Sequence, residues 1–498
     1  MAKGIMVQGT CSNAGKSFLV AALCRIFRQD GYRVAPFKAQ NMALNSFITA
    51  EGLEMGRAQV MQAEAAGVEP SVLMNPILLK PSSDTGSQVI VNGEVVGQMP
   101  ASEYFRRKGE LVPQVMEAYQ ALSQQYDILV LEGAGSPAEI NLKSEDIVNM
   151  GMAARAKAPV LLCGDIDRGG VFASLAGTML LLEPWERAMV KGIVINKFRG
   201  DVEILRPGVR QLEELVRRPV VGVIPWMQVD LDDEDSLSQR LDAERAPGVL
   251  EIAVIRLPRL SNFTDFNPLE RVEGVHLRYV SQLRELGAPD LVILPGTKNT
   301  MGDLLWLRQS GLEAAIQKYA SNGGLVLGIC GGYQMLGRLL RDPQGVEHGG
   351  TLAGMGLLPV ETVFVPQKTR TRTTGRFLPL EGPFAPLGGV LLEGYEIHMG
   401  RTDSDTPAVM LEPQGGMPHP DGAVAGNVLG TYVHGLFDRT EVVEGLLQVL
   451  CQQKGISWEA LCPQDLDIYK QEQYDKLADG VRQSLDMEQI YRILEQGV

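Results

Sequence analysis

The chain has 498 residues, a length that accommodates two large α/β domains or about three domains of average size. Apolar residues make up 45% of the sequence and charged residues 21%, a composition that excludes disorder, collagen and coiled coil as descriptions of the whole chain. The 46 basic and 60 acidic residues give a net charge of −14. A net-acidic chain without a basic block is a poor candidate for binding nucleic acid.

The sequence also argues against a membrane or secreted protein. The longest uncharged apolar stretch, residues 171–182, is shorter than the ~20 residues that cross a bilayer. The N-terminal residues lead directly into a predicted strand, so no signal peptide is expected. The six cysteines are scattered with no CxxC pair, which argues against a disulfide framework or a zinc site and favours the reducing cytoplasm.

Short apolar segments alternate with helical patterns in the first half of the chain. Their continuous Val, Ile and Leu character is typical of parallel strands that are covered on both faces, with helical crossovers between them. The predicted strands are residues 4–9, 33–37, 128–131, 159–163, 192–195 and 220–224. We therefore expect a doubly covered parallel sheet.

An acidic segment, residues 229–248, ends in Pro-Gly and is predicted to be a linker. A second α/β series follows it, with predicted strands at residues 252–255, 291–294, 325–327 and 429–433. Beyond these strands the pattern is helical. The expected organisation is a first α/β domain, the linker, a second α/β domain and a C-terminal helical segment, at residues 1–228, 229–248, 249–440 and 441–498.

The segment QGTCSNAGKS follows the first predicted strand and has the features of a phosphate-binding loop. Gly9 and Gly15 let backbone N–H groups turn toward phosphate oxygens, and the start of the next helix adds partial positive charge. Lys16 is expected to offset charge on the β- and γ-phosphates, and Ser17 to bind Mg²⁺. Five residues, beginning with Thr10, separate the two glycines instead of the common four, which points to a distinct subgroup of such loops.

Further polar residues stand at or near the ends of other strands of this sheet. Glu132 ends the strand ILVLE and offers a carboxylate to Mg²⁺, and Lys38 after the second strand can reach a transferring phosphoryl group. Asn196 in INKFRGD can read a base, and Asp146 in NLKSEDIVNM can contact substrate or metal, or carry charge at a helix N-terminus. Each residue alone is equally compatible with a solvated loop. Because the carboxyl ends of parallel strands share one edge, convergence on an ATP site is predicted.

These motifs resemble the dethiobiotin synthetase-like branch of P-loop ATPases, which has the longer loop, a lysine after the second strand and an EGAG strand end. The resemblance implies that ATP and Mg²⁺ activate a carboxyl group as an acyl phosphate or carbamoyl phosphate. It assigns Lys16, Ser17, Lys38 and Glu132 to phosphate and metal binding, and Asn196 to the adenine.

The segment GGLVLGICGGYQMLG, residues 323–337, predicts a nucleophile. Cys330 stands between a strand and a helix with glycines on both sides, the arrangement of a nucleophile elbow. The helix N-terminus favours the reactive thiolate, and backbone N–H groups near Cys330 and Gly296 can hold an oxyanion. Cys24 and Cys163, by contrast, have the pattern of buried core cysteines.

A thiolate nucleophile needs a partner for proton transfer, and the chain has five histidines. His434 follows the predicted strand GTYV, so it is expected at the same sheet edge as Cys330. His276 and His419 have the pattern of surface residues, and His348 lies in a Gly-rich turn. Cys330 and His434 are therefore the predicted catalytic pair.

The second half resembles the class I glutamine amidotransferase domain, in its strand-PGT motif, its GxCGGxQ motif and its late histidine. The resemblance implies that Gly296, Gly331 and Gln334 serve the oxyanion and the glutamine. Many such domains have Glu two residues after the histidine, whereas this chain has Leu436, so no third triad member is assigned. The imidazole is then expected to be less firmly oriented, which would slow glutamine hydrolysis, or to be oriented by another group. The cobyrinate-type branch of these domains lacks the same Glu, so the resemblance is to that branch in particular.

The order of the two halves resembles the corrinoid amidotransferases of cobalamin biosynthesis. The motifs PFKAQNMALNS, GDIDRGGVFAS, INKFRGD, RLPRLSNFTDFNPL and GYEIHMGRT match the cobyric acid synthase branch over essentially the whole chain. Asn267 stands where this branch is expected to have Asp, which leaves the role of that position open. His398, in the last motif, is expected to contact substrate or to pack between domains.

The resemblance implies a glutamine- and ATP-dependent ligase with a corrinoid substrate. Ammonia freed at Cys330 would attack acyl phosphates formed at the phosphate loop. The b, d, e and g carboxylates of adenosylcobyrinic acid a,c-diamide would become amides, giving adenosylcobyric acid. The sequence makes no prediction of oligomeric state, order of amidation or ammonia route.

Three other functions are compatible with parts of the sequence. A cobyrinic acid a,c-diamide synthase uses the same chemistry on other carboxylates. A cell-wall amidotransferase also joins the two activities, although it usually divides them between chains. A non-enzymatic P-loop switch would bind ATP and a protein partner, but it would not need the GxCGG elbow.

Overall fold

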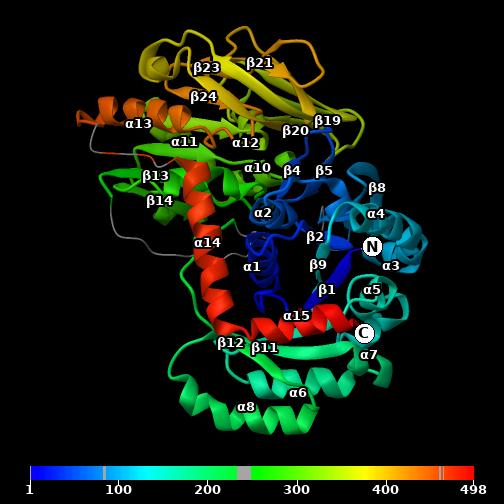
Figure 1. The fold of residues 1–498 in the computed structure, drawn as a ribbon. Coiled ribbons are helices and arrows are strands. Elements are labelled where there is room, and N and C mark those ends of the chain that lie inside the picture. Colours follow the sequence, from blue (N-terminus) through cyan, green and yellow to red (C-terminus); the bar gives the residue numbers. More distant parts are fainter. Residues whose placement is uncertain (1, 82–85, 233–247, 459–460, 462, 464) are drawn as a thin grey trace. The chain divides into compact units, whose positions relative to one another are not determined.

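The computed structural model describes residues 2–498 except 82–85, 233–247, 459–460, 462 and 464, so most of the predicted linker lies outside the described residues. The chain forms two compact units (Figure 1). The first comprises residues 1–43, 54–232 and 470–498, and the second comprises residues 44–53 and 233–469. Each unit contains a sheet with a parallel core, which confirms the predicted α/β class.

The sheet of the first unit has six strands in the order β12-β11-β10-β1-β9-β2, and all neighbours run parallel. These strands are β1 Lys3–Gly9, β2 Val34–Phe37, β9 Ile128–Glu132, β10 Val160–Asp165, β11 Val190–Phe198 and β12 Val220–Pro225. All six predicted strands are confirmed. Strands β2, β9 and β10 are buried along their whole length, as their unbroken apolar sequences require.

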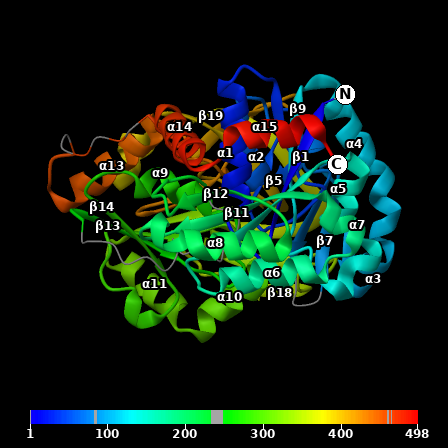
Figure 2. The same cartoon turned by 60° about the horizontal axis from the view of Figure 1, so that its bottom comes forward.

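Helices cover this sheet, and α6 and α8 lie side by side (Figure 2). The helices in this part of the chain are α1 Lys16–Gln29, α2 Arg57–Ala66, α3 Ala101–Arg107, α4 Val112–Gln125, α5 Met150–Ala156, α6 Val171–Leu181, α7 Pro184–Met189 and α8 Val202–Val216. A smaller sheet, in the order β3-β6-β7-β8, was not predicted. Its strands are β3 Gln40–Met42, β6 Ile77–Pro81, β7 Gly86–Val91 and β8 Glu94–Pro100, and the short strand β5 Glu54–Gly56 precedes α2.

The predicted C-terminal helices are present, but they do not form a separate segment. They are α13 Thr440–Lys454, α14 Leu466–Ser484 and α15 Met487–Gln496. Helix α13 belongs to the second unit, whereas residues 470–498 belong to the first, where their apolar side chains join the core around α1. Arg25 of α1 pairs with Asp475 at 2.8 Å, and the rings of Phe27 and Tyr491 lie 5.5 Å apart. Burial of this apolar face explains why the helices join a distant part of the chain.

The second unit has a sheet in the order β14-β13-β15-β16-β24-β23, parallel except for the pair β23–β24. Its strands are β13 Leu250–Ile255, β14 Val275–Val280, β15 Leu291–Leu294, β16 Leu325–Ile329, β23 Ala423–Ala425 and β24 Val428–Thr431. The four predicted strands are confirmed. Helices in this unit include α9 Asn267–Glu270, α10 Thr300–Gln309, α11 Leu312–Ser321 and α12 Gly331–Leu336.

A second, mostly antiparallel sheet in this unit was not predicted. Its strand path is β18-β17-β19-β21-β22, and β20 pairs with β19. The strands are β17 Leu339–Asp342, β18 Gly350–Ala353, β19 Glu361–Phe377, β20 Leu391–Asp403, β21 Val409–Pro413 and β22 His419–Asp421. Strand β4, Ser46–Ile48, comes from the early part of the chain but belongs to this unit. Among the described residues, no helix is long and apolar enough to cross a membrane.

Candidate active sites

The phosphate loop joins β1 to α1 in the first unit. Gly15 has a φ of 94°, and a Cβ there would lie only 2.0 Å from the amide nitrogen of Asn196, so glycine is required. Lys16 begins α1, and its Nζ donates to the carbonyl oxygens of Cys11 at 3.0 Å and Gly135 at 3.1 Å. The backbone N–H of Thr10 donates to Cys163 O at 3.0 Å. The loop is thus held against the neighbouring strand, with the lysine folded over it.

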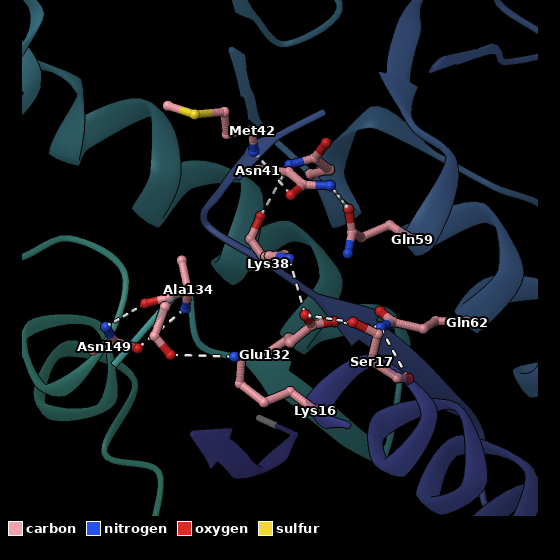
Figure 3. A network of polar contacts seen from close by, with 12 residues as sticks. Lys16, Ser17, Lys38, Asn41, Met42, Gln59, Gln62, Glu132, Ala134 and Asn149 are labelled. Carbon is pink, nitrogen blue, oxygen red and sulfur yellow. Dashed lines mark hydrogen bonds and ion pairs between the residues drawn. The ribbon is translucent and has the colours of Figure 1, made fainter. Parts of the chain in front are cut away.

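A buried carboxylate, Glu132, gathers three donors beside this loop (Figure 3). Lys38 Nζ lies 2.9 Å from its Oε1, and Ser17 Oγ donates to the same oxygen at 3.0 Å. The amide nitrogen of Gln62 donates to Oε2. The structure therefore brings together the ends of β2 and β9 and the start of α1, as the sheet topology predicts.

Gln62 and Gln59 of α2 were not predicted as site residues. Both side chains are buried, and Asn41 donates from its amide to Gln59 Oε1 at 3.0 Å. Gln59 Nε2 and Gln62 Oε1 have no hydrogen-bond partner among the residues that the structure describes, so both atoms can still bond a ligand. In the sequence these residues are two amides in an alanine-rich helix, and nothing there marks them as functional.

Asp146 is engaged by backbone groups at the start of α5. Its carboxylate accepts hydrogen bonds from the N–H groups of Val148, Asn149 and Gly151, at 2.8–2.9 Å. The Asn149 side chain in turn bonds both the N–H and the carbonyl of Ala134, directly after β9 (Figure 3). This geometry gives Asp146 the helix N-terminal position that was the alternative interpretation, and through Asn149 it supports the turn at Ala134 that follows β9. A substrate contact stays a prediction.

Asn196 also lies against the phosphate loop. Its amide donates to Ala14 O at 3.0 Å, and its Oδ1 accepts the N–H of Lys197 at 2.9 Å. Lys197 Nζ donates to Asn13 O and lies 2.8 Å from Asp165 Oδ2. Asn196, which was predicted to contact adenine, therefore stabilises the phosphate loop in this structure. Its contact with adenine stays a prediction.

The metal prediction concerns Ser17 and Glu132, whose oxygens lie 3.0 Å apart. Across the described part of the chain, no group of three or more His, Cys, Asp or Glu side chains is arranged to hold a metal ion. Mg²⁺ commonly binds through only one or two protein oxygens together with substrate phosphates and water. The Ser17 hydroxyl after the phosphate loop and the Glu132 carboxylate at the end of β9 suit that mode of binding.

Cys330 occupies a strained turn between β16 and α12 in the second unit. Its φ is 51° and its ψ is −107°, a backbone conformation that costs a non-glycine residue on the order of 1–3 kcal/mol. Its Sγ lies 3.7 Å from Ile397 O. The turn is the predicted nucleophile elbow. Burial raises the pKa of Cys24 well above its ordinary value and that of Cys163 to about 12, so those thiols stay protonated and inert.

His434 is held by a carboxylate that was not predicted. Its Nδ1 lies 2.7 Å from Asp265 Oδ2, and Asp265 Oδ1 accepts the N–H of Gly435 at 3.0 Å. Both side chains are buried. Leu436 does stand where many amidotransferases have Glu, but the imidazole is not loosely held, because Asp265 from another part of the chain takes the orienting position, in line with the second of the two expectations.

Charge around His434 explains its protonation. Burial opposes the imidazolium, but the Asp265 carboxylate and the Cys330 sulfur outweigh this through their charges and hydrogen bonds, and together they raise the pKa of His434 to about 10. At neutral pH the imidazole is therefore protonated. The imidazolium thus places a proton beside the Cys330 sulfur, where a leaving group can take it.

The predicted oxyanion and glutamine residues surround this pair. A Cβ at Gly296 would lie 2.8 Å from His434 Cε1, so only glycine permits this approach. Gly331 begins α12, directly after Cys330, where helix N–H groups have no acceptor within the helix. Gln334 is buried, with its Oε1 accepting from Thr300 Oγ1 at 2.9 Å and its Nε2 donating to the hydroxyl of Tyr432 at 3.1 Å.

His398 takes part in an internal network of the second unit. Its Nδ1 lies 2.8 Å from Gly400 O, and its Nε2 lies 3.3 Å from Glu396 Oε1. Its ring stacks on Tyr432 with 3.7 Å between centroids. These contacts tie His398 to the residue that holds Gln334, and its role as a substrate contact stays a prediction.

Asp265→Asn is expected to lower kcat for glutamine hydrolysis by roughly 10²- to 10⁴-fold, because the imidazole loses its orienting carboxylate. Asp265 favours the charged imidazolium, so its loss lowers the pKa of His434. Wild-type activity should fall as pH rises through about 10, and in the variant this fall should come at lower pH. A pH profile of kcat/KM measures it, with the exposed Asp405→Asn as control. If the alkaline fall in kcat/KM came at the same pH in Asp265→Asn as in the wild type, Asp265 would not be the group that orients His434.

Fold and sites together define a nucleotide-binding domain and a glutamine amidotransferase domain on one chain. Residues 5–236 match the family model of the CobQ/CobB/MinD/ParA nucleotide binding domain, and residues 251–442 match that of the CobB/CobQ-like glutamine amidotransferase domain. The chain is thus a glutamine-dependent amide-forming ligase.

Relatives that are similar over their full length identify the family within this class of ligases. The cobyric acid synthase of Ruminiclostridium cellulolyticum is 58% identical, over 100% of this chain and 98% of its own. That of Lachnoclostridium phytofermentans is 57% identical over 100% of both chains, and that of Yersinia enterocolitica is 53% identical over 99% of this chain and 98% of its own. The chain belongs to the cobyric acid synthase family.

Proposed function

We propose that the chain uses ATP and glutamine to convert the b, d, e and g carboxylates of adenosylcobyrinic acid a,c-diamide to amides, giving adenosylcobyric acid. The observation that carries this proposal is the buried Cys330–His434–Asp265 constellation on a chain that also has a phosphate loop. Relatives named cobyric acid synthase over their full length support the choice of acceptor.

Ammonia is produced in the second unit. The Cys330 thiolate attacks the side-chain amide carbon of glutamine, and N–H groups at Gly296 and Gly331 stabilise the oxyanion. His434 gives its proton to the departing nitrogen, which leaves as ammonia, and a glutamyl thioester remains. Water then attacks the thioester while His434 takes up a proton, so glutamate leaves and the thiolate–imidazolium pair is restored. Gln334 lines this site and helps to place the glutamine.

The acceptor is activated in the first unit. An oxygen of the corrinoid carboxylate attacks the γ-phosphorus of ATP, the bond to the β-phosphate breaks, and ADP leaves. Lys16 and Lys38 offset the charge that develops on the phosphoryl group, and backbone N–H groups from Gly9 to Gly15 cradle the phosphates. Ammonia then attacks the acyl carbon, inorganic phosphate leaves with its bonding electrons, and the nitrogen gives one proton to the departing phosphate. A carboxylate is a poor electrophile and its acyl phosphate is a good one, which is why the reaction needs ATP.

Further residues of the two sites take supporting roles. Ser17 and Glu132 would hold a Mg²⁺ ion, which supplies charge neutralisation on the phosphates when bound. Asn196 contacts the adenine, and Asp146 supports the turn after β9. His398 borders the glutamine site through Tyr432.

Mass spectrometry of the products tests the proposal against its nearest rival. With ATP, Mg²⁺ and glutamine, the a,c-diamide should gain four amides, and the masses of partly amidated species should appear before the final product. Gain of only two amides, on cobyrinic acid itself, would identify an a,c-diamide synthase instead. ATP binding without any amide formation would favour a P-loop switch.

A further inference from the structure

Residues 44–53 interrupt the first unit and belong to the second. Both flanks of this segment are anchored in the first unit. Before it, Asn41 bonds Gln59 at 3.0 Å, close in sequence to Lys38. After it, the buried carboxylate of Glu54 lies 2.9 Å from the buried Nζ of Lys80. The segment thus leaves the first unit six residues after Lys38 of the proposed ATP site and returns to that unit at the Glu54–Lys80 ion pair.

The segment makes specific polar contacts inside the second unit. The N–H of Ser46 donates to Asn262 Oδ1 at 3.3 Å, and the carbonyl of Ser46 accepts from the hydroxyl of Tyr395 at 3.1 Å. Asn262 Nδ2 donates to the same hydroxyl at 3.0 Å. Phe47 packs edge-on against the Tyr395 ring, with 5.7 Å between centroids. The backbone of Ser46 and the side chains of Asn262 and Tyr395 therefore form a ring of three hydrogen bonds.

Two routes lead from this ring to the catalytic histidine. The Tyr395 ring stacks on His434 with 5.5 Å between centroids and 21° between planes, and the two residues exchange backbone hydrogen bonds of 2.9 and 3.0 Å. Asn262 precedes the one-turn helix Phe263–Phe266, its carbonyl accepts the N–H of Asp265 at 3.0 Å, and Asp265 bonds His434. All of these side chains are buried, so none can move without its neighbours.

We propose that residues 44–53 position the His434–Asp265 pair through Tyr395 and Asn262, and that they couple glutamine hydrolysis to occupancy of the ATP and acceptor site. Tyr395 and Asn262 are positioning residues in this proposal, since they act through His434. The coupling part rests on the proposed function, because it assumes that nucleotide and corrinoid bind near Lys38 and Asn41.

The physical argument for coupling is the shortness of the segment. Ten residues leave little slack, and two hydrogen bonds fix Ser46 to Asn262 and Tyr395, which in turn contact the His434–Asp265 pair. A ligand that reorders the residues before Ala43 or after Leu53 must either move this anchor or strain it. An imidazole misplaced by an ångström loses much of its effect on the leaving nitrogen. The rate of glutamine hydrolysis therefore depends on the state of the ATP and acceptor site, and we expect occupancy of that site to raise it.

Tyr395→Phe tests the proposal in the full chain. It removes two hydrogen bonds and keeps the ring that stacks on His434, so kcat for glutamine hydrolysis should fall roughly tenfold. The KM for glutamine should stay within about twofold, because the variant changes orientation and not the glutamine contacts. The stimulation of hydrolysis by a non-hydrolysable ATP analogue with the a,c-diamide should be lost. Synthesis with ammonium chloride as nitrogen source should be unchanged.

Three further variants sharpen the test. Phe47→Ala, in the segment itself, should reduce the stimulation in the same way. Asn262→Ala combined with Tyr395→Phe should cost less than the sum of the two single changes, because both belong to one ring. Tyr319→Phe is the matched control, since its hydroxyl bonds Pro289 O at 3.0 Å elsewhere in the same unit.

Two results would overturn the proposal. One is hydrolysis and stimulation by Tyr395→Phe at wild-type level. The other is an equal loss of ammonia-dependent synthesis, which would mark a purely structural role. A wild-type chain that hydrolyses glutamine but never amidates the corrinoid would instead overturn the proposed function, and the kcat of Tyr395→Phe would still decide whether the segment positions His434.

Discussion

Cys330→Ala is expected to abolish glutamine-dependent synthesis while leaving ammonia-dependent synthesis intact. Loss of the nucleophile removes the thioester route, so glutamine hydrolysis should fall by roughly a thousandfold or more. Ammonium chloride at high pH supplies free ammonia directly, and the acyl phosphate in the first unit does not depend on a thiol. Amide formation from each nitrogen source, measured by mass spectrometry of the corrinoid, gives the comparison.

The matched control is Cys451→Ala, which removes a buried cysteine of α13 in the same unit. It should keep both activities, apart from a modest loss of stability from the small cavity. If Cys330→Ala lost both activities equally while Cys451→Ala kept both, the division of the reaction into two sites would be wrong. If Cys330→Ala kept glutamine-dependent synthesis, another nucleophile would be required.

The sequence predicted the parts of these sites that are encoded locally. A phosphate loop and a nucleophile elbow are each set by a strand, a few glycines and a helix start within about a dozen residues, so Lys16 and Cys330 could be located without a structure. Lys38, Glu132 and His434 followed because parallel strands deliver their carboxyl ends to one sheet edge.

Asp265 could not be found in the same way. It lies 169 positions before His434, on a one-turn helix, and the order of triad members along a chain differs between folds. The motif FTDFNPL did contain it, but only Asn267 was singled out there. Gln62 was missed for a related reason, because a buried amide is recognisable only once its partner Glu132 is known.

The antiparallel sheet and the division of the chain into two units could not be predicted from the sequence either. Strand β19 has mixed exposure along its 17 residues, so it lacks the unbroken apolar character that revealed the parallel strands. The C-terminal helices looked like an appendage because nothing local shows that Asp475 pairs with Arg25. Residues 44–53 carry no composition shift that would mark a crossing from one unit to the other.

Lys16→Ala should stop synthesis from either nitrogen source, which makes it the counterpart of Cys330→Ala. Removal of one preorganised positive charge from a phosphoryl-transfer site costs about 10²- to 10³-fold in rate. The Nζ of Lys16 now donates to two carbonyls of the loop region, at 3.0 and 3.1 Å, and it would exchange these for phosphate oxygens when ATP binds. Corrinoid amidation with glutamine and with ammonium chloride measures the effect.

The same variant should hydrolyse glutamine in the absence of nucleotide at the wild-type rate, because the Cys330–His434–Asp265 site belongs to the other unit. Lys3→Ala, which removes an exposed lysine at the start of β1, is the control and should behave as wild type throughout. Synthesis by Lys16→Ala from ammonia at an undiminished rate would show that this lysine does not serve the transferred phosphoryl group. Loss of nucleotide-free hydrolysis as well would mean that the charge supports both reactions, and the assignment of separate chemistry to each unit would fail.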